Sequence, residues 1–205
     1  MYLLDAGRHA ALTGLGDALD YGSIHTAFPG PTGANEASGG TPAYARKALT
    51  WASPAAGKRL TSTLVQFDLP AGTYQWFGGW SASSGGTFYG ATPLGNKPLR
   101  SLSMVGTGSS ATFNQANHGL ANGARLVLLD VGATGMPGGF TEGTTYFVVG
   151  ATTNTFQLAA TAGGAAIGSV DSTEVFAKQL VPVVLTAQDV LDLGPGASIL
   201  DATIL

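Results

Sequence analysis

Residues 144–159 have the sequence TTYFVVGATTNTFQLA. Tyr146 to Val149 and Phe156 to Leu158 are short runs dominated by aromatic and aliphatic residues, and the link Gly150 to Asn154 between them is rich in turn-forming residues. This pattern predicts a β-hairpin. The 31 glycines and the clusters of Ser, Thr and Gly divide the rest of the chain into similarly short segments, which is typical of an all-β protein.

The hairpin belongs to a series of short strands in the middle of the chain. The expected strands are Ser110 to Asn114, Ala124 to Val131, Thr144 to Gly150, Thr155 to Ala159 and Thr173 to Lys178. A second series flanks it: Tyr21 to Ala27, Tyr44 to Trp51, Thr61 to Leu69, Thr73 to Ala82, Thr87 to Ala91, Val181 to Thr186, Val190 to Leu193 and Ser198 to Leu205. The last strands resemble the first flanking strands more than the middle ones, which indicates an insertion.

The predicted fold class is therefore all-β, with two domains formed by one interrupted chain. Residues 1–99 and 180–205 are expected to form a β-sandwich, and 100–179 a small β-barrel-like module inserted in one of its loops, since exposed loops tolerate insertions. One short helix is expected at the start, where apolar residues recur at near-helical spacing although three glycines weaken the pattern. The apolar residues are Leu3, Leu4, Ala11, Leu12, Leu15 and Leu19, and the glycines are Gly7, Gly14 and Gly16.

The composition limits the classes of function. Charged residues make up 10% of the chain, far below the roughly 25% of an ordinary soluble domain. Such a surface suits a protein whose faces meet other proteins. The net charge of −3 includes no basic run, so nucleic-acid binding is not expected. The chain has no cysteine, so we expect no disulfides. Asp5, Arg8 and His9 interrupt the apolar start, so we expect neither a secretory signal nor membrane insertion.

Two glycine-rich segments and three histidines fail as ligand sites. Gly106 to Ala111 matches Gly-x-Gly-x-x-Ala, but strand-like residues follow it where a dinucleotide site needs a helix, so it predicts a turn. Gly95-Asn96-Lys97 lacks the Gly-Lys-Ser/Thr ending of a phosphate-binding loop. His9, His25 and His118 lie far apart, without the spacing of metal ligands. We therefore expect no cofactor, no metal and no catalytic residue.

One polar group stands out around the Pro- and Gly-rich loop Phe28 to Gly40. The loop carries Asn35 and Glu36, and its return between two strands would bring Glu36 onto His25 or Arg46. We favour an ion pair that pins the loop over a catalytic role.

Aromatic residues concentrate in the first domain, and most of them should be core. Because Tyr74 and Trp76 alternate with Gln75 and Phe77, aromatic rings point to both faces of that strand, and some are expected at a subunit contact. The interface candidates are Trp76, Trp80 and Tyr89. A platform for sugar rings is the less favoured alternative.

The loop region also carries a resemblance. Ser23 to Glu36 has the sequence SIHTAFPGPTGANE, followed by Ser38-Gly39-Gly40 and Tyr44-Ala45-Arg46. It resembles a family of small tailed-bacteriophage virion proteins, called minor tail or tail-fibre proteins, with the signature His-Thr-Ala-x-Pro-Gly, Gly-Ala-Asn-Glu, Gly-Gly, Tyr-Ala-Arg. Phe67 to Thr73 and the Trp80 to Gly90 hairpin are similar to the same family, and Thr41-Pro42-Ala43 departs slightly from its loop length.

The middle of the chain carries a second resemblance. Asn117 to Gly123, Thr141 to Val149 and Asn154 to Leu158 resemble a small β module that recurs in phage tail and fibre proteins. Together the resemblances imply a virion component, made in the host cytoplasm, that adorns or joins the particle and has no catalytic residue.

Three functions follow as expectations. The first is a tail-associated structural or fibre-type protein, a homo-oligomer that contacts other virion proteins and the host cell surface. The alternative is a capsid-decorating or head-fibre protein that stabilises the shell exterior. An enzyme that degrades surface glycans comes last, because no pair of carboxylates stands out.

Overall fold

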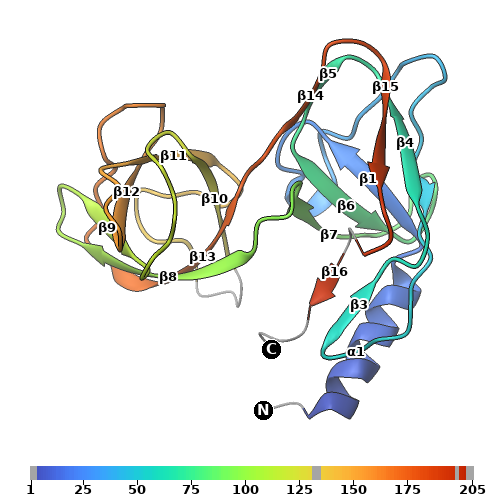
Figure 1. The fold of residues 1–205 in the computed structure, drawn as a ribbon, viewed down its shortest axis with the longest axis horizontal. Coiled ribbons are helices and arrows are strands. Elements are labelled where there is room, and N and C mark those ends of the chain that lie inside the picture. The colour runs from blue at the N-terminus through green and yellow to red at the C-terminus, as the bar shows by residue number, and fades with distance from the viewer. Residues whose placement is uncertain (1–3, 131–134, 197–198, 202–205) are drawn as a thin grey trace. The chain divides into compact units, whose positions relative to one another are not determined.

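The structure, a computed structural model, describes residues 4–130, 135–196 and 199–201 (Figure 1). Strands dominate it, in agreement with the all-β prediction. The chain divides into two compact units: Gly95–Val181 forms one, and the described residues up to Leu94 form the other with those from Pro182 onward. The predicted module, 100–179, lies within the first of these ranges.

The unit Gly95–Val181 is a closed β-barrel. Its strands follow one another around the barrel in the order β10-β11-β12-β9-β8-β13, and each neighbouring pair is antiparallel. Their bounds are β8 Leu99–Gly106, β9 Ala111–Asn114, β10 Arg125–Leu129, β11 Thr145–Val149, β12 Thr155–Ala159 and β13 Ser172–Gln179. Pairing of β10 with β13 closes the ring, so the barrel presents no free strand edge. The predicted hairpin is β11-β12 and is confirmed.

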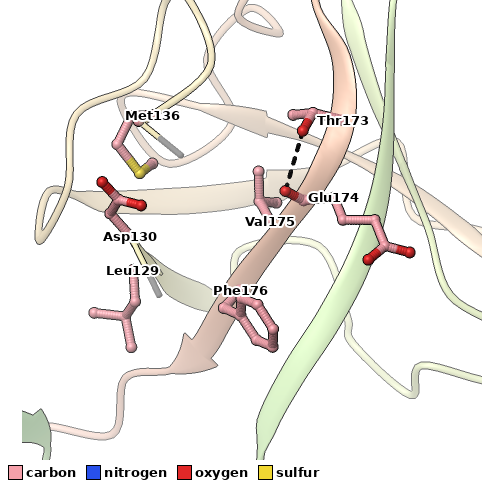
Figure 2. Close-up of a pocket in the computed structure, with 8 residues that line it drawn as sticks. Leu129, Asp130, Met136, Thr173, Glu174, Val175 and Phe176 are labelled. Carbon is pink, nitrogen blue, oxygen red and sulfur yellow. Dashed lines mark hydrogen bonds between the residues drawn. The ribbon is translucent and has the colours of Figure 1, made fainter. Parts of the chain in front are cut away.

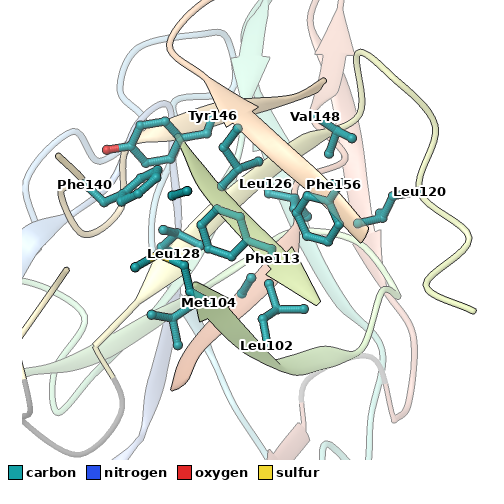
Figure 3. Close-up of a cluster of buried hydrophobic side chains, with 14 residues drawn as sticks. Leu102, Met104, Phe113, Leu120, Leu126, Leu128, Phe140, Tyr146, Val148 and Phe156 are labelled. Carbon is teal, nitrogen blue, oxygen red and sulfur yellow. The ribbon is translucent and has the colours of Figure 1, made fainter. Parts of the chain in front are cut away.

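Alternating side chains fill the barrel interior. In β8 and β9 more buried and more exposed residues alternate, with Leu102, Met104, Ala111 and Phe113 buried, as expected for strands with one face toward a core. Figure 3 shows the ring of Phe113 among the inward-pointing side chains, with ring centroids 5.5 Å from Phe140 and 5.4 Å from Phe156. The Gly-x-Gly-x-x-Ala segment is the turn between β8 and β9, where the Thr107 N–H donates to the carbonyl of Ser110, so that prediction is confirmed.

The other unit contains a four-stranded antiparallel sheet in the order β2-β1-β6-β7 and three two-stranded ladders, β14-β5, β15-β4 and β16-β3. The strands are β1 Tyr21–His25, β2 Lys47–Ala48, β3 Lys58–Leu60, β4 Val65–Leu69, β5 Gly72–Tyr74, β6 Trp76–Trp80, β7 Phe88–Pro93, β14 Val183–Leu185, β15 Asp189–Leu193 and β16 Ile199–Asp201. One apolar core joins residues of the sheet and of the ladders, among them Ile24, Phe67 and Tyr74. The predicted sandwich arrangement of these layers stays a prediction.

The C-terminal segment completes this unit. β14, β15 and β16 run antiparallel to β5, β4 and β3, so that the chain returning from the barrel retraces the earlier strands in reverse order. Figure 1 shows β14 and β15 beside β5 and β4. The segment before the barrel therefore depends on the segment after it for three ladders.

The predicted helix is α1, Asp5–Ala18, and a short 3-10 helix, Gly30–Thr32, lies in the loop that follows β1. Arg59 of β3 holds α1 in place: its Nη1 donates to the carbonyl of Thr13 at 2.7 Å and to Oδ1 of Asp17 at 2.9 Å. A Cβ at Gly16 would collide with this guanidinium, so one of the glycines that weaken the helical pattern is needed for packing.

Several predicted strands differ from the structure. The strand expected over Tyr44 to Trp51 is reduced to β2, because the residues before it belong to the loop. The strand expected over Thr73 to Ala82 divides at Gln75, since β5 pairs with β14 whereas β6 pairs with β1. β3 and β8 were not predicted. Of the strand expected over 198–205 only Ile199–Asp201 is described, and Val131 also lies outside the described residues.

Candidate functional site

The loop between β1 and β2, residues 26–46, brings together the four residues singled out in the sequence. β1 ends at His25, which forms an isolated antiparallel bridge with Glu36 on the returning arm of the loop. Asn35 precedes that bridge, and Arg46 stands at the end of the loop. The structure therefore places His25, Asn35, Glu36 and Arg46 in one cluster.

Arg46 and Glu36 form the predicted ion pair, which is confirmed. Arg46 Nε donates to Oε1 of Glu36 at 2.9 Å, and Nη2 donates to Oε2 at 2.8 Å. Nη1 donates to the carbonyls of Ala82 and Gly85, and the guanidinium carbon lies 3.4 Å from the centroid of the Trp80 ring. An ammonium group offers neither this bidentate geometry nor the stacking, so lysine could not replace Arg46.

Tyr44 connects the ion pair to the sheet. Its hydroxyl donates to Oε1 of Glu36 at 3.2 Å and accepts the N–H of Ile24 at 2.9 Å. Burial strongly raises the pKa of Tyr44, so the phenol stays protonated and remains a donor to the carboxylate.

His25 is fully buried and is held in one tautomer. Nδ1 lies 2.8 Å from the carbonyl oxygen of Ala34, which can only accept, so Nδ1 carries the proton. Nε2 lies 2.7 Å from Oγ of Ser23, and that oxygen accepts Nε1–H of Trp80 at 2.9 Å. The Ser23 hydroxyl therefore donates to Nε2. Burial lowers the pKa of His25 below its ordinary value.

Asn35 and Gly33 fix the backbone of the loop. Asn35 has a positive φ of 59°, which asparagine tolerates, and its Nδ2 donates to the carbonyl of Phe28 at 2.8 Å. Gly33 also has a positive φ, 73°, and a Cβ there would meet the Trp80 ring. Only glycine fits that position.

A glutamine that the sequence analysis missed clamps the loop from the C-terminal segment. Nε2 of Gln188 donates to the carbonyl of Pro42 at 3.0 Å, and its Oε1 accepts the N–H of Thr41. The amide thus satisfies one acceptor and one donor of the loop backbone. No local sequence pattern marks this contact, because Gln188 lies far along the chain from both partners.

The cluster is organised to hold backbone. The polar side-chain atoms of His25, Glu36 and Arg46 contact backbone carbonyls, the hydroxyls of Ser23 and Tyr44, or each other. A general base or nucleophile would instead need a side chain aimed at a space that a substrate can enter. The arrangement can fix a loop in one conformation.

The interface candidates among the aromatic residues need correction. Trp76 is 1% exposed and Trp80 is 6% exposed, so neither offers an open ring to a neighbouring subunit. Trp80 is buried because the loop covers it, with the Arg46 guanidinium over the face of the ring and Gly33 packed close to the ring. Tyr89 on β7 is 46% exposed and stays a candidate.

A pocket of about 190 Å³ lies in the barrel unit, beside β10 and β13. Ligand pockets usually begin at roughly 300 Å³ and contain converging polar groups. Figure 2 shows the Glu174 side chain extending away from Asp130, and the Thr173 hydroxyl donating to the carbonyl of Glu174. This pocket therefore gives no reason to assign a ligand.

The remaining histidines lie apart from the loop, in α1 (His9) and in the barrel unit (His118). Nδ1 of His118 accepts the N–H of Leu120 at 3.0 Å, and Nε2 lies 3.3 Å from the carbonyl of Thr155. This imidazole therefore closes a barrel loop. Over residues 4–130, 135–196 and 199–201, no group of three or more His, Cys, Asp or Glu side chains could hold a metal ion.

Comparisons with protein-family models, with curated proteins and with solved structures find no match to this chain. Among the described residues, no helix has the length and apolar character that crossing a membrane requires.

Proposed function

We propose that this protein is a structural component of a tailed-bacteriophage particle, a minor tail or fibre-type protein that works through its surfaces. The observation that carries the proposal is the structural role of the residues that resemble the phage family. His25, Asn35, Glu36, Tyr44 and Arg46 all belong to that signature, and in this chain all of them hold the loop. A binding or assembly protein requires residues that hold a contact loop in one conformation, and the residues of this signature do so.

The loop offers a surface suited to contact with a neighbour. Residues 38–43 at its tip are exposed, while Gln188 clamps their backbone. Binding residues are commonly found on loops that a rigid scaffold positions, since a fixed loop loses little entropy on binding. We interpret the unit beneath the loop as a β-sandwich body, with the four-stranded sheet and the ladders as its layers.

Low charge and exposed apolar side chains on the returning strands support the same proposal. Val184 on β14 is 64% exposed and Val190 on β15 is 44% exposed. Both strands have one hydrogen-bonded neighbour among the described strands, so their other edges are open to a partner. We propose a homo-oligomer in which such surfaces meet other copies or other virion proteins.

Counting copies of the protein in purified particles tests the proposal. Quantitative mass spectrometry of intact virions should find it at a copy number set by tail symmetry, roughly tens at most. Hundreds of copies would instead indicate the alternative, capsid decoration. Absence from the particle would refute both structural proposals and return attention to an enzyme acting on host glycans.

A matched pair of variants tests the role of the loop surface. Ala43→Arg places a long cation on the exposed loop, and Ala160→Arg places the same side chain on the exposed surface of the barrel unit. Both proteins should fold, and Ala43→Arg alone should reduce incorporation into particles. Equal incorporation of the two variants would show that the loop makes no essential contact.

A further inference from the structure

We infer that the buried His25 ring, which links Ser23 of the sheet to Ala34 of the loop, is a proton-sensitive latch: when His25 takes up a proton on Nε2, the loop segment 26–37 detaches from the sheet while the barrel keeps its structure. The latch is a property of the fold and does not depend on the proposed function. It is argued from the geometry around one buried imidazole.

The neutral ring is part of a chain of hydrogen bonds. Trp80 Nε1–H donates to Ser23, Ser23 donates to Nε2 of His25, and Nδ1–H of His25 donates to the carbonyl of Ala34. A proton on Nε2 would make that nitrogen a donor, directed at a serine oxygen 2.7 Å away that already accepts from Trp80. The Ser23 hydroxyl proton would then lose its acceptor, and an unsatisfied buried donor is costly.

The surroundings leave little room to repair this loss. A Cβ placed on Gly78 of β6 would lie 2.6 Å from Nε2 of His25 and 2.7 Å from Oγ of Ser23. The Phe88 ring of β7 covers the imidazole from another side, with ring centroids 5.9 Å apart. A water molecule that could take over the lost hydrogen bond needs polar space of its own size. The backbone of β6 and the ring of Phe88 fill the volume close to Nε2.

The charged groups near His25 do not offset the positive charge that a protonated ring would carry beside Arg46. From β1, β6 and β7 the ring meets Ser23, Gly78 and Phe88, none of which is charged. From the loop, Glu36 raises the pKa of His25 and Arg46 lowers it, and these two side chains are paired with each other. The phenol of Tyr44 is neutral and bonded to Glu36. Burial is the largest influence and lowers the pKa of His25, and it outweighs the hydrogen bond to the Ala34 carbonyl, which raises the pKa, so the neutral ring is favoured.

The direction of the pH effect follows from linkage. The pKa of His25 in the folded protein lies below the ordinary value of 6.5 that it regains on release. The released state therefore binds more protons between these two values. The stabilisation of the attached loop by neutral His25 is complete above pH 6.5. It is lost as the pH falls toward the pKa of His25 in the folded protein.

Amide hydrogen exchange measures the latch directly. In the loop, Thr26 N–H donates to Asn35, Ala34 N–H to Pro29 and Ala37 N–H to Ile24. After correction for intrinsic exchange rates, the protection of these amides should fall by up to about tenfold per pH unit between pH 6.5 and the pKa of His25 in the folded protein, because one proton is linked to opening in that interval. The barrel amides of Gly123 and Val148, which donate to Val148 and Ala124, serve as the internal control and should stay constant.

Ring ¹⁵N chemical shifts supply the second measurement. His25 should show the Nδ1–H tautomer and titrate below 6.5, whereas His118 should show Nε2–H. His25→Gln should keep the loop amides pH-independent between pH 7.5 and pH 5. The latch is refuted if His25 titrates at or above 6.5, if the loop stays protected while His25 titrates, or if His25→Gln keeps the same pH dependence. Should that variant fail to fold, the wild-type titration and exchange data still decide.

Discussion

The two units of this chain reach stability by different means. The barrel is closed, and its interior is a cluster of fourteen buried hydrophobic residues that touch one another. The other unit has small sheets with open edges, and long polar side chains cross between its elements. Arg46, Arg59 and Gln188 each bind backbone groups remote in the sequence. Side chains such as Asn122 and His118 also bind remote backbone groups in the barrel, but there they fix loops on a ring of strands that is already closed. In the open assembly of ladders, Arg59 and Gln188 join separate elements, a helix and the C-terminal segment, to the rest of the unit.

The comparison can be tested because the three tryptophans, Trp51, Trp76 and Trp80, all lie outside the barrel. Intrinsic tryptophan fluorescence therefore reports unfolding of one unit, while far-ultraviolet circular dichroism reports both. The largest effect is expected for Phe113→Ala, which removes a ring that stacks on Phe156 and meets Phe140 edge to face in the barrel core.

Phe113→Ala should destabilise the barrel by roughly 3–5 kcal/mol, the cost of a large cavity in a packed core. Denaturant titration should then show an early dichroism transition, with the tryptophan transition unmoved. If both signals shift together, the two units unfold as one and the contrast between them fails.

The next effect concerns the pinned loop. Arg46→Met keeps an apolar stem against Trp80 but leaves the Glu36 carboxylate with the Tyr44 hydroxyl and no cation, which should cost about 2–3 kcal/mol. Lys47→Met is the matched control, because the Lys47–Asp68 pair is more exposed and joined by a single 3.0 Å contact. Exposed pairs contribute about 0–1 kcal/mol.

Tryptophan-monitored unfolding measures both variants. If Lys47→Met lost as much unfolding free energy as Arg46→Met, the bidentate geometry of Arg46 would add no stability beyond that of a simple ion pair.

Alanine substitutions at two glycines of α1 should change the stability by smaller amounts and in opposite directions. A Cβ at Gly14 meets nothing, whereas one at Gly16 would strike the Arg59 guanidinium. Gly14→Ala should therefore stabilise the unit by up to about 1 kcal/mol through helix propensity. Gly16→Ala should destabilise it by roughly 1–3 kcal/mol through overpacking. Thermal unfolding followed by fluorescence compares them, and two changes of the same sign would contradict the docking of α1 on Arg59.

The sequence predicted those features whose signal is local. Short apolar runs separated by turn-forming residues predict five barrel strands, and the return of the loop between two strands predicts that Glu36 approaches a cation. β3, with the residues Lys58-Arg59-Leu60, has no such signal, since the strand it pairs with, Ile199–Asp201, lies far along the chain. The contact of Gln188 with Thr41 and that of Arg59 with Thr13 depend on tertiary structure alone.

The buried tryptophans show the limit of reasoning from alternation. Trp76 and Trp80 occupy the same face of β6, and the sequence does not reveal that a loop covers part of that face. The chain positions the loop through Gly33, which fits against Trp80, and through Ser23, which accepts its indole N–H. An aromatic residue that looks free in a strand pattern can be buried by a loop that only the fold brings to it.

The smallest effect is expected from the largest change, removal of the barrel. Leu99 pairs directly with Lys178, so the two ends of the barrel lie side by side and a short Gly/Ser linker can replace 99–178. Loop-closure entropy changes by only about 0.6 kcal/mol for each doubling of loop length, and a shorter loop favours the closed state. The midpoint reported by tryptophan fluorescence should therefore move little, because the ladders β14-β5, β15-β4 and β16-β3 keep all their strands. A protein that no longer folds after this deletion would show that the barrel, despite its separate core, is required for the C-terminal strands to find their partners.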